Sequence, residues 1–166
     1  IRDHCVTGVQ TCALPICSAG HYCAQPNTQS KCSIGSYCEE GNAVVNPPCP
    51  EGYYCPTPSE KKECIPGSYC PEKSTEPILC APGSFTSTNK SINCTGCEIG
   101  DYCQQGATER SNCASGYYCP LPSSQIECTV GMYCPQRSSS MSICPSGKWC
   151  DGSEEVHSCP RGTFCP

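Results

Sequence analysis

Apolar positions in this chain recur in short clusters, not as a helical stripe or a long alternating strand. Each cluster is one aromatic residue held between two cysteines in the pattern C-x-x-G-x-aromatic-C. Polar segments, nine to eleven residues counted from cysteine to cysteine, separate most clusters. Gly and Pro recur too often for a helix of three turns. The pattern therefore predicts short turns and small β-hairpins with little or no helix.

The pattern is a tandem repeat of about ten units. It occurs nine times in full, and a tenth copy keeps Gly83 and Phe85 but has Thr86 where the second cysteine is expected. Successive opening cysteines lie 15 to 17 residues apart. Such a nearly constant period indicates that each repeat forms one structural unit of the fold. The full copies open at Cys17, Cys32, Cys49, Cys64, Cys97, Cys113, Cys128, Cys144 and Cys159, and the incomplete copy opens at Cys80.

Each position of the motif has a physical role. The glycine permits positive φ, so the chain can turn sharply. The aromatic ring is the largest apolar group of a unit, and we expect it to pack on the disulfide and on the next unit's turn. Proline follows the second cysteine at several positions, such as Pro56 and Pro120, and prevents helix growth there. One unit cannot bury its own ring, so units should stack mainly on their neighbours in an elongated rod.

Composition explains what must hold such units together. The 166 residues include 22 Cys, which is about 13%, but only twenty Leu, Ile, Val and Phe. That apolar content is too small for a Rossmann domain, a barrel enzyme or a helix bundle. The cysteine content indicates a small disulfide-rich protein from an oxidising compartment, extracellular or at the cell surface. The net charge of −5 gives no basic surface for nucleic acid, and no apolar stretch is long enough to cross a membrane.

The first sixteen residues have a different origin in our interpretation. IRDHCVTGVQTCALPI resembles the translation of a sequencing-library adapter, with His4 and Cys5 encoded by its index bases. We therefore exclude residues 1–16 from fold reasoning, which removes Cys5 and Cys12 from the disulfide count. The remainder is expected to be a fragment of a longer chain from an environmental sequence assembly. We divide it into four regular repeats (17–79), one irregular repeat (80–96) and five regular repeats (97–166).

Two disulfide schemes fit the spacing. In the first, the two cysteines of each motif pair, and Cys80 pairs with Cys94. In the second, each second cysteine pairs with the next first one, so Cys94 pairs with Cys97, and both ends need partners outside the fragment. We favour the first, because it uses all twenty repeat cysteines. They are Cys17, Cys23, Cys32, Cys38, Cys49, Cys55, Cys64, Cys70, Cys80, Cys94, Cys97, Cys103, Cys113, Cys119, Cys128, Cys134, Cys144, Cys150, Cys159 and Cys165.

The stretch CAPGSFTSTNKSINCTGC, from Cys80 to Cys97, resembles the cysteine-rich modules of ephrin-receptor-like and tumour-necrosis-factor-receptor-like ectodomains. The resemblance implies that the first cysteine of this stretch bonds the cysteine near its end. Regular units such as CPEGYYCP at 49–56 resemble long arrays in surface proteins of unicellular eukaryotes. These units are shorter than receptor modules and mostly lack the third cysteine pair, so no ligand site is transferred.

Other candidate chemistry is sparse. Cys94 and Cys97 form a C-x-x-C without a second pair at zinc-finger spacing, so we expect no metal and no cofactor. No nucleophile motif occurs, and His21 and His157 lie in unrelated units, so we expect no enzyme. The acidic pairs Glu39-Glu40 and Glu154-Glu155 are interpreted as solvated surface. Arg161-Gly162-Thr163 contains the repeat glycine and is not an adhesion motif.

Two sequons occur in the irregular unit, Asn89-Lys90-Ser91 and Asn93-Cys94-Thr95. We expect both on a surface loop, with Asn89 favoured as a glycosylation site because Cys94 is expected to be bridged. The chain as a whole is predicted to be a structural spacer, coat or fibre element. Its expected partners are other extracellular proteins or further copies in a fibre. The alternatives are a ligand-binding receptor or adhesin ectodomain and a stalk that carries a catalytic domain elsewhere in the parent.

Overall fold

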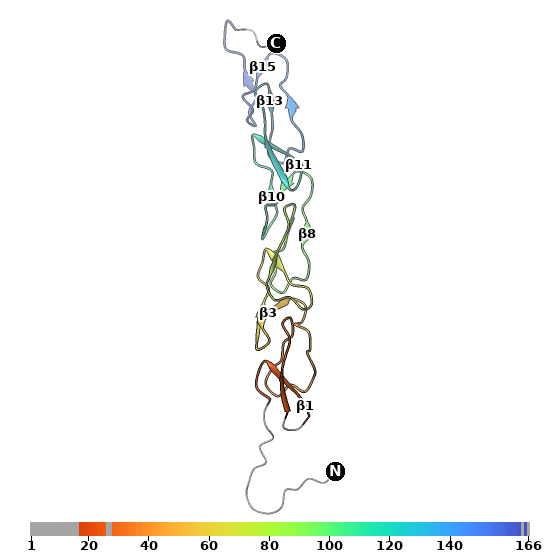
Figure 1. Cartoon of the computed structure of the whole chain (residues 1–166). Coiled ribbons are helices and arrows are strands. Elements are labelled where there is room, and N and C mark those ends of the chain that lie inside the picture. The colour runs from red at the N-terminus through yellow and green to blue at the C-terminus, as the bar shows by residue number, and fades with distance from the viewer. Residues whose placement is uncertain (1–16, 26–27, 164, 166) are drawn as a thin grey trace, which may run out of the picture.

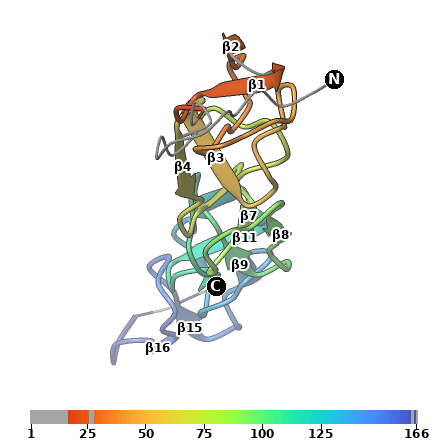
Figure 2. The same cartoon turned by 90° about the horizontal axis from the view of Figure 1, so that it is seen from below.

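The structure is a computed structural model that describes residues 17–25, 28–163 and 165. The adapter-like segment 1–16 and the ring of Phe164 lie outside the described residues. Figure 1 shows an elongated stack of hairpins, with β1 towards one end and β15 towards the other. Seen from below, the hairpins lie one behind another along the stack (Figure 2). We number the units 1 to 10 by their opening cysteines, from Cys17 to Cys159.

Each unit from 1 to 9, unit 2 excepted, forms one antiparallel two-stranded sheet, and unit 2 has a single bridge, Ser36 to Pro48. The described residues contain no helix, which confirms the predicted fold class. The pairs are β1 (His21–Gln25) with β2 (Thr28–Lys31), β3 (Tyr53–Thr57) with β4 (Glu60–Glu63), β5 (Ser68–Tyr69) with β6 (Ile78–Leu79), β7 (Ser84–Phe85) with β8 (Thr95–Gly96), β9 (Asp101–Tyr102) with β10 (Ser111–Asn112), β11 (Tyr117–Leu121) with β12 (Ser124–Glu127), β13 (Met132–Tyr133) with β14 (Ser142–Ile143), and β15 (Lys148–Trp149) with β16 (His157–Ser158).

The motif glycine begins each hairpin. In unit 4 the Ser68 N–H donates to the Ile65 carbonyl oxygen (3.2 Å), and Gly67 between them has φ 79°. This is the geometry of a type II turn, which favours proline before the glycine, as at Pro66. The residue after the glycine and the aromatic residue then form the first strand, because the turn leaves the chain extended.

Three units extend this hairpin. In units 1, 3 and 7 the first strand continues through the second cysteine, with a register shift between Tyr54 and Thr57 in unit 3. Their spacers share a proline three residues after that cysteine, as at Pro58 and Pro122. Proline at this position favours a tight turn between the two strands. The other units have strands of two residues and a longer loop. The array therefore has two kinds of unit.

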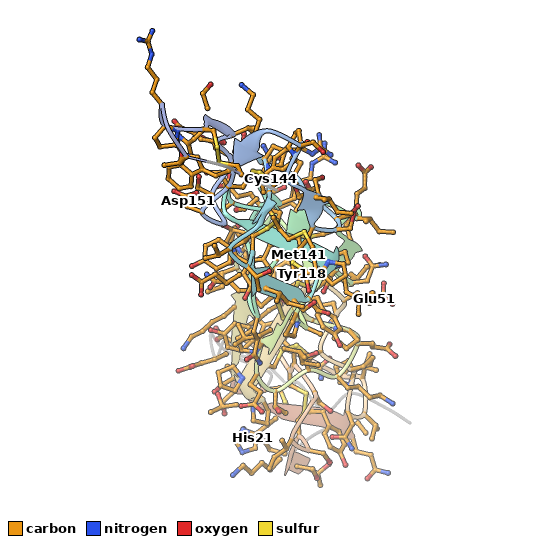
Figure 3. All side chains as sticks on the ribbon, turned by 90° about the horizontal axis from the view of Figure 1, so that it is seen from above. His21, Glu51, Tyr118, Met141, Cys144 and Asp151 are labelled. Carbon is orange, nitrogen blue, oxygen red and sulfur yellow. A yellow bond between two sulfur atoms is a disulfide. The ribbon has the colours of Figure 1, made fainter. Side chains whose placement is uncertain are left out.

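The core of the array consists of disulfides. Among the described residues the buried apolar side chains are fourteen half-cystines, and no aliphatic or aromatic side chain is buried. The motif rings that the structure describes are half-buried, apart from Trp149 at 40% exposure. Figure 3 shows side chains such as Glu51 and Asp151 projecting outward from the ribbon. Bridges therefore occupy the place that aliphatic side chains fill in an ordinary domain.

Candidate functional site: the joints between units

Backbone hydrogen bonds join neighbouring units from unit 1 to unit 9. Between units 3 and 4, the Gly52 N–H donates to the Cys70 carbonyl oxygen (2.9 Å) and the Cys55 N–H to that of Ser74 (2.9 Å). In the reverse direction, the Lys73 N–H donates to the Cys49 carbonyl oxygen (2.9 Å). The first of these bonds recurs in six joints, as Gly20–Cys38, Gly52–Cys70, Gly67–Thr86, Gly83–Cys103, Gly116–Cys134 and Gly131–Cys150.

The joint explains how unit 5 does without its second cysteine. Thr86 accepts from the Gly67 N–H (2.8 Å) and donates its own N–H to the Ala107 carbonyl oxygen (3.2 Å). Both bonds use backbone atoms, so they do not depend on the side chain at this position. Thr86 is buried, and its hydroxyl lies 2.5 Å from that of Ser91. The stack therefore continues through the irregular unit.

Units 1 to 7 also contact the unit after next through the motif glycine. A Cβ added to Gly52 would lie 2.6 Å from the Lys90 carbonyl oxygen, and one added to Gly100 would lie 2.7 Å from that of Arg137. Both glycines also have positive φ, so the position needs glycine for two reasons. The expectation that units contact mainly their immediate neighbours is therefore too narrow. The approaches are Gly20 to Ser59, Gly35 to Lys73, Gly52 to Lys90, Gly67 to Gly106, Gly83 to Ser123, Gly100 to Arg137 and Gly116 to Gly152.

In five of these seven approaches the glycine meets a spacer residue that we call the corner residue. It follows the second-cysteine position by two to four residues and has positive φ even where it is not glycine, as at Lys73 (68°), Lys90 (59°) and Arg137 (68°). A non-glycine residue in this conformation costs about 1–3 kcal/mol. At every corner residue but Gly152, the N–H donates to the carbonyl oxygen of the first cysteine of the preceding unit, and this bond holds the residue in place. The corner residues are Gly41, Lys73, Lys90, Gly106, Arg137 and Gly152.

The corner residue Lys90 connects units 5 and 3 through its side chain. Its Nζ lies 2.8 Å from Glu63 Oε1 and 5.0 Å from the centroid of the Tyr53 ring. These neighbours, the Glu63 carboxylate first, hold the pKa of Lys90 well above its usual range. The Lys90 and Glu63 side chains are about half solvent-accessible, at 46% and 50%, and solvent screening therefore limits the energy of the pair.

The corner residue Arg137 makes the corresponding contact between units 8 and 6. Its Nε lies 3.5 Å from Oδ1 of Asp101, a residue that is only 1% exposed. Asp101 directly follows Gly100, as Tyr53 follows Gly52, so both contacts join the same two positions of the repeat. Neither oxygen of Asp101 has a hydrogen-bond donor among the described residues. Sequence reasoning singled out only the acidic pairs, which are exposed, and missed this buried carboxylate.

The disulfides follow the first pairing scheme. Nine bridges close within a motif, and Cys80 pairs with Cys94 across the irregular unit. All cysteines of the described part are paired. The motif bridges are Cys17–Cys23, Cys32–Cys38, Cys49–Cys55, Cys64–Cys70, Cys97–Cys103, Cys113–Cys119, Cys128–Cys134, Cys144–Cys150 and Cys159–Cys165.

The other candidates lie apart from one another. His21 is in β1, whereas the His157 ring stacks on Trp149 with centroids 4.4 Å apart. Sequence reasoning missed this stack, although the two residues are cross-strand partners in one hairpin. Glu39, Glu40, Glu154 and Glu155 are exposed. Gly162 has φ 84° within a repeat turn, as the sequence indicates.

Both sequon asparagines, Asn89 and Asn93, are exposed. No group of three or more His, Cys, Asp and Glu side chains that could hold a metal ion occurs in the described ranges. Within the same residues no helix is long and apolar enough to cross a membrane. Open depressions lie over units 4 to 6. The most regular feature of the described residues is therefore the set of joints between units.

Comparison with known proteins adds no family. No protein-family model matches the chain, and no curated protein matches it.

Proposed function

We propose that this chain is a segment of an extracellular array that acts as a stiff spacer, coat or fibre element and carries no catalytic site. The observation that supports this most is the double connection of units 1 to 7, each to the next unit through backbone bonds and to the one after it through the glycine contacts. A unit bonded only to its neighbour can pivot at the joint. Contact with a second neighbour resists that pivot, so the array should bend little.

The disulfide core supports an extracellular location. Twenty half-cystines in ten bridges suggest an oxidising environment. Each local bridge also stabilises the folded chain, because it removes loop-closure entropy from the unfolded chain. The resemblance of Cys80–Cys97 to ephrin-receptor-like and tumour-necrosis-factor-receptor-like modules is consistent with a cell-surface parent. Other extracellular proteins, or further copies in a fibre, are the partners that this role implies.

Small-angle X-ray scattering of the full chain, secreted from eukaryotic cells, tests the spacer role. A compact chain of this length has a radius of gyration of about 15 Å, and a stiff rod should exceed it clearly. The pair-distance distribution should be that of a rod, with one short cross-section and a long tail. A value near the compact limit would remove the spacer role and leave a ligand-binding ectodomain as the better interpretation.

A further inference from the structure

The seam between units 4 and 5 carries an exposed apolar floor. Ile78 is 42% and Leu79 54% exposed, and with the half-buried Tyr69 they line a shallow depression. Ile78 and Leu79 occupy the two positions before the next opening cysteine. In the other units at least one of these two positions holds a polar or charged residue, glycine or proline, as in Lys62-Glu63. Unit 4 is therefore unusual in presenting two aliphatic side chains on its second strand.

Asn93 lies at the rim of this depression. Asn93 and Ser84 supply its polar edge from unit 5, opposite the aliphatic floor from unit 4. Asn93 is exposed and begins the sequon Asn93-Cys94-Thr95. Asn89, the other sequon asparagine, lines none of the depressions over units 4 to 6. In the structure Asn93 therefore borders an apolar depression and Asn89 does not, a difference that the sequence alone does not reveal.

We propose that Asn93 carries an N-linked glycan and that its first N-acetylglucosamine lies over Tyr69, Ile78 and Leu79. A pyranose has an apolar face of C–H groups that packs on aromatic and aliphatic side chains, and its hydroxyl and acetamide groups need polar partners at the edge. The depression offers both, with Ser84 at the polar edge. A sugar attached at the rim is held at high effective concentration over the floor, so weak packing suffices.

The attachment is a group transfer from a polyprenyl-diphosphate-linked oligosaccharide. The carboxamide nitrogen of Asn93 forms a bond to C1 of the first sugar and loses one proton to a base of the transferase. The bond between C1 and the diphosphate oxygen breaks, and the diphosphate leaves with the electron pair. Transfer must precede closure of the Cys80–Cys94 bridge or proceed on the exposed loop, because Cys94 is the middle residue of the sequon.

The first test is site occupancy on the full chain secreted from eukaryotic cells. Glycan release by an amidase in heavy-oxygen water converts an occupied asparagine to labelled aspartate, which mass spectrometry locates. Thr95→Ser keeps the sequon and should keep the label at residue 93, whereas Thr95→Ala should lose it. Thr95 contributes its backbone to the pairing with Phe85, so both variants keep the hairpin, and Asn93→Gln provides a second loss variant.

The second test is contact with the floor. The Thr95→Ser protein should show nuclear Overhauser effects between the sugar and the Leu79 methyl groups. The Thr95→Ala protein should bind more of a hydrophobic dye, and this difference should disappear when Ile78 and Leu79 are both changed to Ser. An unmodified residue 93 overturns the proposal, as does an occupied site without sugar–Leu79 contacts. Concentration-dependent dimerisation of the glycosylated protein through Ile78 and Leu79 would assign the floor to a second copy instead.

The inference rests on the proposed extracellular location but not on the rod. Expression in a secretory pathway tests Asn93 whatever the shape of the array, and scattering tests the shape whatever the state of Asn93. The two proposals can therefore fail separately.

Discussion

The carboxylate of Asp101 in unit 6 meets the guanidinium of Arg137 in unit 8, with Oδ1 and Nε 3.5 Å apart. Asp101 is almost fully buried, whereas Arg137 is half-exposed. In units 4 and 5 the position of Asp101 holds a serine whose hydroxyl donates locally, as Ser68 does to the Ile65 carbonyl oxygen (2.7 Å). A carboxylate cannot donate in this way, so it depends on a cation two units away.

Replacing Arg137 should therefore destabilise the array through Asp101. We expect Arg137→Ala to lower the free energy of unfolding by about 1–3 kcal/mol, because a buried charge loses its only close cation. Alanine also keeps the strain of positive φ, which Arg137→Gly relieves. The double variant Asp101→Ser/Arg137→Gly restores the arrangement of units that have serine and glycine there, and it should recover most of the loss. Denaturant unfolding under non-reducing conditions measures each step. Equal losses for the single and double variants would show that the pair is not the cause.

Much of the fold is predictable from the sequence because the repeat fixes local geometry. The glycine and aromatic positions predict the hairpins, and the displaced Cys94 points to its pairing with Cys80. The second-neighbour contacts are not predictable in the same way. The corner residue is glycine, lysine or arginine, and its distance from the second-cysteine position varies. Nothing local to Asp101 marks Arg137 as its partner, because the contact depends on how the units stack.

Full reduction should unfold the array. The described part buries no aliphatic side chain, so no apolar core can hold the fold once the bridges are reduced. Each bridge within a motif contributes roughly 2 kcal/mol in the chain-entropy model, and the longer Cys80–Cys94 loop about 3 kcal/mol. Circular dichroism and limited proteolysis, with and without reductant, measure the change. Protease protection that survives complete reduction would contradict the disulfide core.

Alkaline pH should weaken the contact of Lys90 with unit 3. The raised pKa of Lys90 means that its protonated form favours the folded state. This contribution is fully present below the unfolded pKa of about 10.5 and is lost as pH rises from there through the folded value. Lys90→Met should therefore make unfolding less dependent on pH above about 10, whereas Lys90→Arg should keep the pair. Urea unfolding across this range measures it. The same alkaline slope in Lys90→Met would assign the effect to groups other than Lys90.

The glycine contacts give the sharpest test of stiffness, because the chain offers a matched pair. Gly52 and Gly147 both have positive φ, but only Gly52 has atoms of another unit where a Cβ would lie. Gly147→Ala should cost about 1–2 kcal/mol, the penalty of the left-handed conformation alone. Gly52→Ala carries the same penalty and also displaces Lys90, whose carbonyl oxygen and Cβ would be 2.6 Å and 2.9 Å away.

We therefore expect Gly52→Ala to unfold at lower denaturant concentration than Gly147→Ala, and to bend the array between units 3 and 5. Scattering should report the bend as a shorter maximum dimension at unchanged cross-section, while Gly147→Ala keeps the length of the parent chain. Hydrogen exchange at the Lys90 N–H, which donates to the Cys64 carbonyl oxygen (2.9 Å), should accelerate in Gly52→Ala. Two variants with equal stability and equal length would mean that second-neighbour contacts do not stiffen the array, and its rigidity would then have to come from the joints between adjacent units.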